Sequence, residues 1–467
     1  MLEAEFGPSL DVAVLEAKQW LASLEQRPIR PELDGTAMLD RFDDELPVKG
    51  ERADAVVRML AEGSRSGLMA MGSGRFFGWV IGGALPAAIA ADWLVSAWDQ
   101  NAGMAELCPA VCAIEQVAAR WILQLLGLAP TCSVGFVTGG QMANTVCLAA
   151  ARTHVLGAHG WDVEADGLIG APPVTVVVGA ERHSTIDRGL RFLGLGSRSI
   201  RTVDVDEAGR MIPEDLEAVL DNVSGPTIVC AQAGNVNGGA VDNFGPIADT
   251  LGRRRDDVWL HVDGAFGLWA RAVPSRRHLL NGVERADSWA TDAHKWLNVP
   301  YDCGMAICAR PEAHRRAMTV RASYLPAGDE ENLRNPVDFT PEFSRRARAV
   351  PVWAALRQLG VEGVAEMVDR CCSMAERFAS SLEGHDGVHV MHQDLNQVVV
   401  RFTTAGGSDD DHTRDIIKTV QREGTCLPSA TVWRGFAAMR ISVSNWRTDE
   451  ADVDRSVQAI LEVHRAC

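Results

Sequence analysis

The sequence lacks an excess of positive charge, a long unbroken apolar run and cysteine pairs with metal-ligand spacing. The formal net charge of −17 argues against nucleic acid or an anionic membrane as partner. The most apolar stretch, residues 80–98, contains Pro86 and Asp92, so we expect no membrane span. The eleven scattered cysteines predict no metal site and suit a reducing compartment. Residues 1–6 are acidic and do not resemble a signal peptide, so we expect a cytoplasmic protein.

The hydrophobic pattern predicts a large globular α/β protein. Hydrophobic residues make up 47% and charged residues 23%, as in ordinary globular enzymes. Apolar strand candidates alternate with amphipathic helical segments, which predicts a mostly parallel seven-stranded sheet covered on both faces. The strand candidates are residues 133–137, 174–178, 199–203, 227–230, 258–262, 288–291 and 305–308.

The chain length predicts two or three packed units. We expect an N-terminal helical arm over residues 1–85, a large domain over 86–350 and a small α+β domain over 351–467. In the small domain we expect helices at 352–359, 361–382, 412–423 and 450–464, and strands at 388–391, 397–402 and 439–443.

A lysine beside a histidine follows one strand candidate, in the segment Asp292-Ala293-His294-Lys295-Trp296. In apolar surroundings, desolvation disfavours the ammonium, and the amine then becomes a nucleophile that can form a Schiff base. The alternative is an ordinary solvated lysine, which is the commoner case for this residue type.

Three further segments place polar groups at strand ends. Asp263 follows the strand at 258–262, where it either meets a ligand or caps a turn. His183 follows the strand at 174–178, either to cover a planar ligand or to bond a loop carbonyl. A Gly139-Gly140-Gln141 turn opens a helix, whose free N–H groups bind anions. This turn matches neither the dinucleotide fingerprint nor a P-loop.

Together, the order glycine turn, histidine, aspartate, lysine resembles that of the group II pyridoxal-phosphate-dependent amino-acid decarboxylases. That family contains the aromatic-amino-acid, histidine and glutamate decarboxylases. The resemblance runs from about Gly74 to the C-terminus and includes the segments at residues 261–265, 292–296 and 344–348. It implies the fold of the fold-type I transferases that use pyridoxal 5′-phosphate (PLP). It also implies a homodimer in which the arm wraps the partner.

By this resemblance, Lys295 forms the Schiff base and Asp263 pairs with the pyridine nitrogen, which keeps the ring able to accept electrons. His183 stacks on one ring face, and the small Ala265 packs on the other. The implied cofactor residues are Gly139, Gly140, Gln141, His183, Asn237, Asp263, Ala265, Asp292, His294 and Lys295.

Two of these residues differ from the family pattern. Relatives usually carry asparagine where Asp292 stands, and a carboxylate near a phosphate is unfavourable unless it is paired or held away. Asn237 stands where relatives have a threonine-rich turn. It either bonds the cofactor or only shapes the turn.

The resemblance favours decarboxylation of an L-amino acid to its amine through a quinonoid intermediate. However, relatives use a loop tyrosine to protonate Cα, and this chain has only two tyrosines, Tyr301 and Tyr324. The aromatic residue nearest to the expected place is Phe339, which cannot donate a proton. Alternatives are therefore an aldehyde-forming oxidative decarboxylase, a transaminase, a carbon–carbon lyase or a non-catalytic scaffold of the same fold.

The substrate pocket in relatives is lined at the positions of Trp79, Val80, Ile81 and Gly82, and by residues 101–103 of the partner. Trp79 is either a pocket wall or a core residue. Arg401 and Arg440 lie in C-terminal strand candidates, where each either reaches a substrate carboxylate or makes a structural pair.

Overall fold

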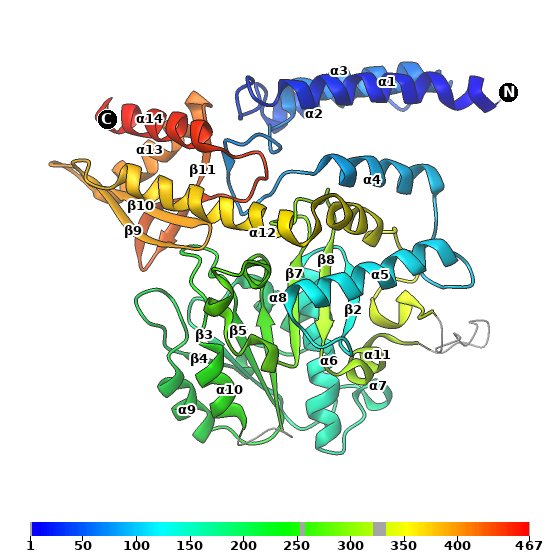
Figure 1. Cartoon of the computed structure of the whole chain (residues 1–467), viewed down its shortest axis with the longest axis vertical. Coiled ribbons are helices and arrows are strands. Elements are labelled where there is room, and N and C mark those ends of the chain that lie inside the picture. Colours follow the sequence, from blue (N-terminus) through cyan, green and yellow to red (C-terminus); the bar gives the residue numbers. More distant parts are fainter. Residues whose placement is uncertain (1, 253–256, 321–332, 467) are drawn as a thin grey trace.

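The computed structural model describes residues 2–252, 257–320 and 333–466. Its centre is a seven-stranded sheet with the order β2-β8-β7-β6-β5-β3-β4 (Figure 1). Strands β4, β3, β5, β6 and β7 pair in parallel, whereas β8 runs antiparallel to both of its neighbours. The strands are β2 (Ser133–Val137), β3 (Thr175–Gly179), β4 (Ile200–Val203), β5 (Thr227–Gln232), β6 (Val258–Asp263), β7 (Ser288–Asp292) and β8 (Gly304–Cys308). The prediction of a mostly parallel seven-stranded sheet is confirmed.

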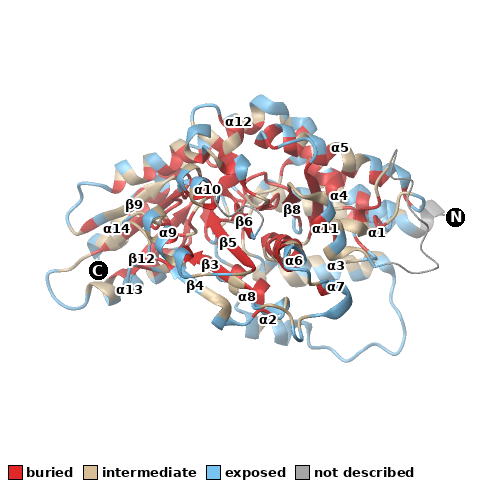
Figure 2. Cartoon of the chain, turned by 90° about the horizontal axis from the view of Figure 1, so that it is seen from below, coloured by how far each residue is buried: buried red, intermediate tan, exposed pale blue. Residues whose placement is uncertain are grey.

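Helices cover both faces of this sheet, which is why its strands are almost continuously apolar. Val176 and Val178 face a core cluster shared with α6, whereas Val177 between them faces a second cluster. Buried residues are concentrated in the central strands and α6 (Figure 2). The helices are α1 (Leu2–Ser23), α2 (Gly35–Phe42), α3 (Ala53–Ser64), α4 (Pro86–Trp98), α5 (Pro109–Leu126), α6 (Gly140–Ala158), α7 (Val163–Asp166), α8 (Ser184–Phe192), α9 (Pro213–Asp221), α10 (Phe244–Gly252), α11 (Pro311–Met318), α12 (Ala349–Leu382), α13 (Asp409–Glu423) and α14 (Glu450–Ala466).

Several helix starts follow from single residues. Proline opens α4, α5, α9 and α11, where its missing N–H costs no hydrogen bond. The α13 helix begins with a cap, because the Ser408 hydroxyl accepts from the amide of Asp411. Short 3-10 helices occur at Arg65–Gly67, Ser197–Ser199, Gly267–Ala272, Arg277–Leu280, Val283–Arg285 and Pro336–Phe339.

A second, five-stranded sheet has the order β1-β11-β12-β10-β9. Its strands are β1 (Phe76–Phe77), β9 (Val388–Asp394), β10 (Gln397–Phe402), β11 (Leu427–Trp433) and β12 (Phe436–Ser442). β1 comes from the segment assigned to the N-terminal arm and pairs in parallel with β11, which was not predicted from the sequence. The break expected between residues 359 and 361 is a change of direction within α12, where Gly360 has φ 65°. The domain limits at 85 and 350 stay predictions.

The arm helices α1 and α3 pack on each other and extend away from the seven-stranded sheet (Figure 1). Among the described residues, no helix combines the length and the apolar character that crossing a bilayer requires.

Candidate active site

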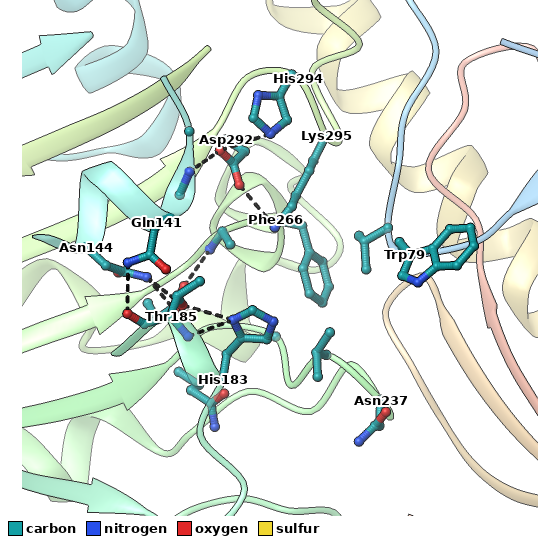
Figure 3. Close-up of a pocket in the computed structure, with 18 of the residues that line it drawn as sticks. Trp79, Gln141, Asn144, His183, Thr185, Asn237, Phe266, Asp292, His294 and Lys295 are labelled. Carbon is teal, nitrogen blue, oxygen red and sulfur yellow. Dashed lines mark hydrogen bonds and ion pairs between the residues drawn. The ribbon is translucent and has the colours of Figure 1, made fainter. Parts of the chain in front are cut away.

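A cavity of about 820 Å³ opens at the carboxyl ends of β5, β6 and β7, facing β11 and β12 of the small sheet. Open α/β sheets bind ligands at these strand ends, and the volume suits a cofactor with its substrate. Trp79 and Asn237 lie across the cavity from Gln141 and Asn144 (Figure 3). Every cofactor residue predicted from the sequence lines it: Gly139, Gly140, Gln141, His183, Asn237, Asp263, Ala265, Asp292, His294 and Lys295. Their individual roles stay predictions.

Lys295 follows β7 in a turn held by the backbone. The amides of Ala293 and His294 both donate to the carbonyl of Cys303, and the amide of Asn298 donates to that of Lys295. The Lys295 side chain extends into the cavity, where its Nζ lies 3.0 Å from Oδ2 of Asp292 (Figure 3). The turn therefore presents one amine together with a buried counter-ion.

The glycine turn between β2 and α6 lies directly against this lysine turn. A Cβ on Gly139 would stand 2.9 Å from Cε1 of His294, and one on Gly140 would stand 2.7 Å from Oδ2 of Asp292. Side chains are therefore excluded from both positions. The first amides of α6 point toward the cavity end, where the helix dipole favours an anion.

Asp263, at the end of β6, is a buried carboxylate with three hydrogen-bond donors. Its Oδ2 accepts from Asn144 Nδ2 at 3.1 Å and from the Thr185 hydroxyl at 3.4 Å, and its Oδ1 accepts from the amide of Ala265 at 3.2 Å. Asn144 and Thr185 were not predicted from the sequence. The signal for Asn144 was its spacing, because it lies four residues after Gly140 on α6 and therefore on the same helix face.

Behind Asn144, a buried chain of donors fixes the direction of these bonds. Asn144 gives its Nδ2 to the Asp263 carboxylate, so its Oδ1 accepts from Nε2 of His261. Nδ1 of His261 accepts at 2.9 Å from the Ser288 hydroxyl, which itself accepts from Trp259 Nε1 at 2.8 Å. His261 then carries its proton on Nε2, 2.9 Å from Oδ1 of Asn144. The hydrogen bond to His261 thus holds the Asn144 side chain in the orientation in which its amide nitrogen faces Asp263.

His183 occupies the N-terminal cap of α8, and its Nδ1 accepts from the amide of Thr185 at 3.3 Å. Burial lowers the pKa of His183, with the charge of Asp263 acting in the opposite direction. The ring is therefore neutral near neutral pH. A neutral ring fixed by its cap is suited to lie over a planar cofactor.

His294 and Tyr301 stack with ring centroids 4.4 Å apart, and both line the cavity. Nδ1 of His294 accepts from the amide of Cys303 at 3.0 Å, and burial lowers the pKa of His294. Burial, reinforced by Asp292, raises the pKa of Tyr301 to about 12, so its phenol stays protonated. Tyr301, one of the two tyrosines of the chain, therefore lies at the cavity wall and is 55% exposed.

Phe339, the aromatic residue that the sequence placed nearest to the missing loop tyrosine, does not line the cavity. Its ring meets His314 edge-on at 5.3 Å, and its carbonyl lies 3.0 Å from Nε2 of His314. Phe339 is thus held by packing within its own chain. Tyr324, the other tyrosine, lies outside the described residues.

The predicted substrate-pocket segment divides into two parts. Trp79 and Val80 line the cavity, and both have positive φ (52° and 59°), which turns the chain sharply there. Ile81 and Gly82 are not among the residues that line the cavity of the single chain, and their place in the substrate pocket stays a prediction. Ile81 packs against a core cluster that contains Leu24 and Phe76. Gly82 lies against the carbonyl of Lys295, where no Cβ fits.

The two C-terminal arginines have different surroundings. Arg401 ion-pairs with Asp410 at 3.0 Å and packs over Phe436, so it makes a structural pair. Arg440 is only 7% exposed, lines the cavity and donates to the carbonyl of Val236 at 3.2 Å. Burial lowers the pKa of Arg440 to about 10, so it remains a cation at neutral pH.

Asn237 also lines the cavity, and its Oδ1 accepts from the Thr431 hydroxyl of β11 at 2.7 Å. The turn itself is shaped by Asn235, whose Oδ1 accepts from the amides of Asn237 and Gly238. The side chain of Asn237 therefore joins the large sheet to the small one at the cavity wall.

These groups fit PLP. The start of α6 suits a phosphate, the hydrogen-bonded carboxylate of Asp263 suits a protonated ring nitrogen, and the amine of Lys295 suits an aldehyde. No cluster of three or more histidine, cysteine or acidic side chains that could hold a metal ion occurs among the described residues.

Comparisons with known proteins identify this class of enzyme. The solved structure of Oryza sativa TDC with PLP and tryptamine has a TM-score of 0.91 and 25% identity, and the match covers 99% of this chain and 98% of that one. The aromatic-L-amino-acid decarboxylase of Bacillus atrophaeus is 27% identical over 91% of this chain and 88% of its own length. The 4-hydroxyphenylacetaldehyde synthase of Rhodiola rosea is 28% identical, over 95% and 92% respectively. The fold is that of the fold-type I enzymes, and PLP is the cofactor, as predicted from the sequence.

Residues 36–405 match the model of the pyridoxal-dependent decarboxylase conserved domain. The chain belongs to the pyridoxal-dependent decarboxylase family. The prediction of a PLP-dependent carboxy-lyase that acts on an amino acid is thereby confirmed.

Proposed function

We propose that this protein is a cytoplasmic homodimer that decarboxylates an L-amino acid to its amine, with Lys295, Asp263 and His183 as its catalytic residues. The observation that carries this proposal is that the amine of Lys295, the carboxylate of Asp263 and the glycine turn line one cavity. Bound PLP supplies the electron sink for the pair of electrons left at Cα. The aromatic-L-amino-acid decarboxylase among the relatives supports an amino-acid substrate.

The residues of the cavity take separate roles in this proposal. Lys295 holds the cofactor covalently, and Asp263, fixed by Asn144 and Thr185, keeps the ring nitrogen protonated. The neutral ring of His183 covers one face of the cofactor, and Ala265 leaves room on the other.

Arg440 is proposed to bind a carboxylate of the substrate. Its guanidinium lies in the cavity, its donors meet a hydroxyl and a carbonyl, and no ion pair joins it to a carboxylate in the described part of the chain. A buried cation without an acidic partner is a strong site for a substrate carboxylate, because the pairing occurs away from water.

The proposed homodimer is supported by the apolar surface of the arm and of the helix that follows it, α4. Large side chains on α1, α3 and α4 are exposed in the single chain: Phe6, Leu10, Leu15, Met59, Leu60, Trp93, Leu94 and Trp98. Apolar surface of this extent usually meets a partner. The cytoplasmic location is supported by the cysteines, each a free thiol across residues 2–252, 257–320 and 333–466. Light scattering of the purified protein tests the dimer.

The experiment that tests the function compares wild type with Lys295→Ala and Lys418→Ala. Lys418 is exposed and pairs only at the surface with Asp415, so it serves as the matched control. Wild type and K418A should be yellow with PLP and release carbon dioxide from at least one amino acid in a broad screen, whereas K295A should do neither. Retention of the cofactor absorbance and of activity in K295A would refute the assignment.

An aldehyde-forming oxidative decarboxylase is the second candidate, favoured by the similarity to the 4-hydroxyphenylacetaldehyde synthase of Rhodiola rosea. It would consume oxygen and release ammonia and peroxide in step with carbon dioxide. Amine formation without oxygen uptake would exclude it.

A further inference from the structure

Asp292 is a buried carboxylate. Its two oxygens contact the Gly140 amide, which suits the cofactor phosphate, and the Lys295 amine, which suits the cofactor aldehyde. Its Oδ1 accepts from the amide of Gly140 at 2.5 Å, and its Oδ2 lies 3.0 Å from Nζ of Lys295 (Figure 3). Nε2 of His294 lies 3.4 Å from Oδ1. The residue is 1% exposed, so these contacts are made away from water.

The position of this carboxylate is set by the backbone. The amide of Asp292 donates to the carbonyl of Ala265 at 2.9 Å, and its own carbonyl accepts from Trp269 Nε1 at 3.0 Å. The missing side chain of Gly140 leaves the space that the carboxylate fills. The same glycine turn can therefore bind either the carboxylate of Asp292 or a phosphate.

Two electrostatic consequences follow from these contacts. The carboxylate attracts Nζ of Lys295 at 3.0 Å and holds it beside the glycine turn. A carboxylate on the Gly140 amide also repels a phosphate and competes with it for that donor. When the amine condenses with an aldehyde, one water leaves and the nitrogen keeps a proton and its positive charge. The carboxylate thus faces a cation before and after cofactor attachment.

We propose that Asp292 is a positioning residue that holds Nζ of Lys295 in an ion pair in the cofactor-free enzyme and occupies the Gly140 amide until the phosphate displaces it. The ion pair with the nitrogen of residue 295 persists after this displacement. The inference rests on the proposed role of Lys295 and adds a residue that controls how the cofactor enters.

The first test measures the lysine in the cofactor-free protein. Asp292→Asn keeps the shape of the side chain and removes its charge. We expect Lys295 in D292N to react with trinitrobenzenesulfonate on the order of tenfold faster than in wild type, because the ion pair that holds its Nζ is lost. Mass spectrometry locates the label, and the exposed Lys418 provides the internal reference rate.

The second test measures the effect of the phosphate group alone. It compares the binding of PLP with the binding of pyridoxal, which lacks the phosphate. We expect the ratio of the pyridoxal Kd to the PLP Kd to rise on the order of tenfold in D292N, because the repulsion acts on PLP alone. Asp302→Asn is the matched control, since Asp302 lies in the neighbouring turn and pairs with Arg348 near the surface. Neither measurement should change in D302N.

A D292N protein that matches wild type in either measurement overturns the proposal, and Asp292→Ser provides a second variant should D292N misfold. The outcome is separable from that of the proposed function. K295A that retains its cofactor absorbance refutes the role of Lys295, whereas an unchanged D292N beside a colourless K295A refutes only the role of Asp292.

Discussion

The buried amide of Asn144 offers the sharpest test of how the site is built. Asn144 is 1% exposed and joins His261 to Asp263. Replacement by alanine removes a hydrogen bond to a carboxylate, worth roughly 1.5–3 kcal/mol, and leaves Nε2–H of His261 buried without an acceptor, at a cost of about 1–3 kcal/mol. We therefore expect Asn144→Ala to lower the free energy of unfolding by about 3 kcal/mol or more.

The assay is denaturant unfolding of the cofactor-free protein, followed by titration with PLP. Asn222→Ala is the matched control, because Asn222 is exposed at the end of α9 and bonds only its own helix. Its unfolding free energy should change by less than about 0.5 kcal/mol. In N144A, the loosened carboxylate of Asp263 should also weaken PLP binding by roughly tenfold, or about 1.4 kcal/mol. An N144A protein that unfolds like N222A would show that the hydrogen-bonded chain does not support the site.

Three further predictions use other contacts. Burial lowers the pKa of His314 to about 3, so the unfolded chain binds a proton that the folded chain refuses. Stability should fall as the pH decreases from 6.5 toward 3, by up to about 1.4 kcal/mol per pH unit, and His314→Gln should flatten this pH dependence of the denaturation midpoint. Gly140→Ala forces a Cβ against Asp292 and should abolish PLP binding measured by absorbance, whereas Gly157→Ala, with open space, should not. Arg440→Gln should raise KM for the amino acid at least tenfold, whereas Arg401→Gln should leave it within twofold; equal KM values would refute the carboxylate site.

Six of the seven strands of the large sheet are buried along nearly their whole length, which favours apolar side chains and makes them predictable, whereas half of the residues of the edge strand β4 are exposed. β11 and β1 lack that signal. β11 contains Pro428, Ser429 and Thr431 and alternates in burial toward its end, and β1 has only two residues. Their pairing joins residue 76 to residue 427, and the local pattern carries no information about such a distant partner.

The residues of the candidate site likewise divide into those that the sequence could predict and those that it could not. Residues at the carboxyl ends of strands were predictable, since parallel strands bring their ends to one edge and the motifs lie at those ends. The positions of Ile81 and Gly82 depend on the positive φ of Trp79 and Val80. That backbone conformation is set by packing and not by the intrinsic φ preferences of these two residues. Arg401 and Arg440 look alike in the sequence, because the acids that pair with Arg401 belong to the separate helix α13.

The choice between amine and aldehyde products is affected most by the aromatic residues. The sequence-based reason for an aldehyde product was Phe339 in the place of a proton donor, but the ring of Phe339 is engaged by His314 and Arg334 of its own chain. Tyr301 instead lines the cavity, stacked on the histidine that precedes Lys295. A phenol whose pKa is raised to about 12 holds its proton throughout the neutral range and is lost as a donor only in strong alkali. Among the described residues, Tyr301 is therefore the tyrosine that lines the cavity, and formation of the amine requires a proton donor of this kind.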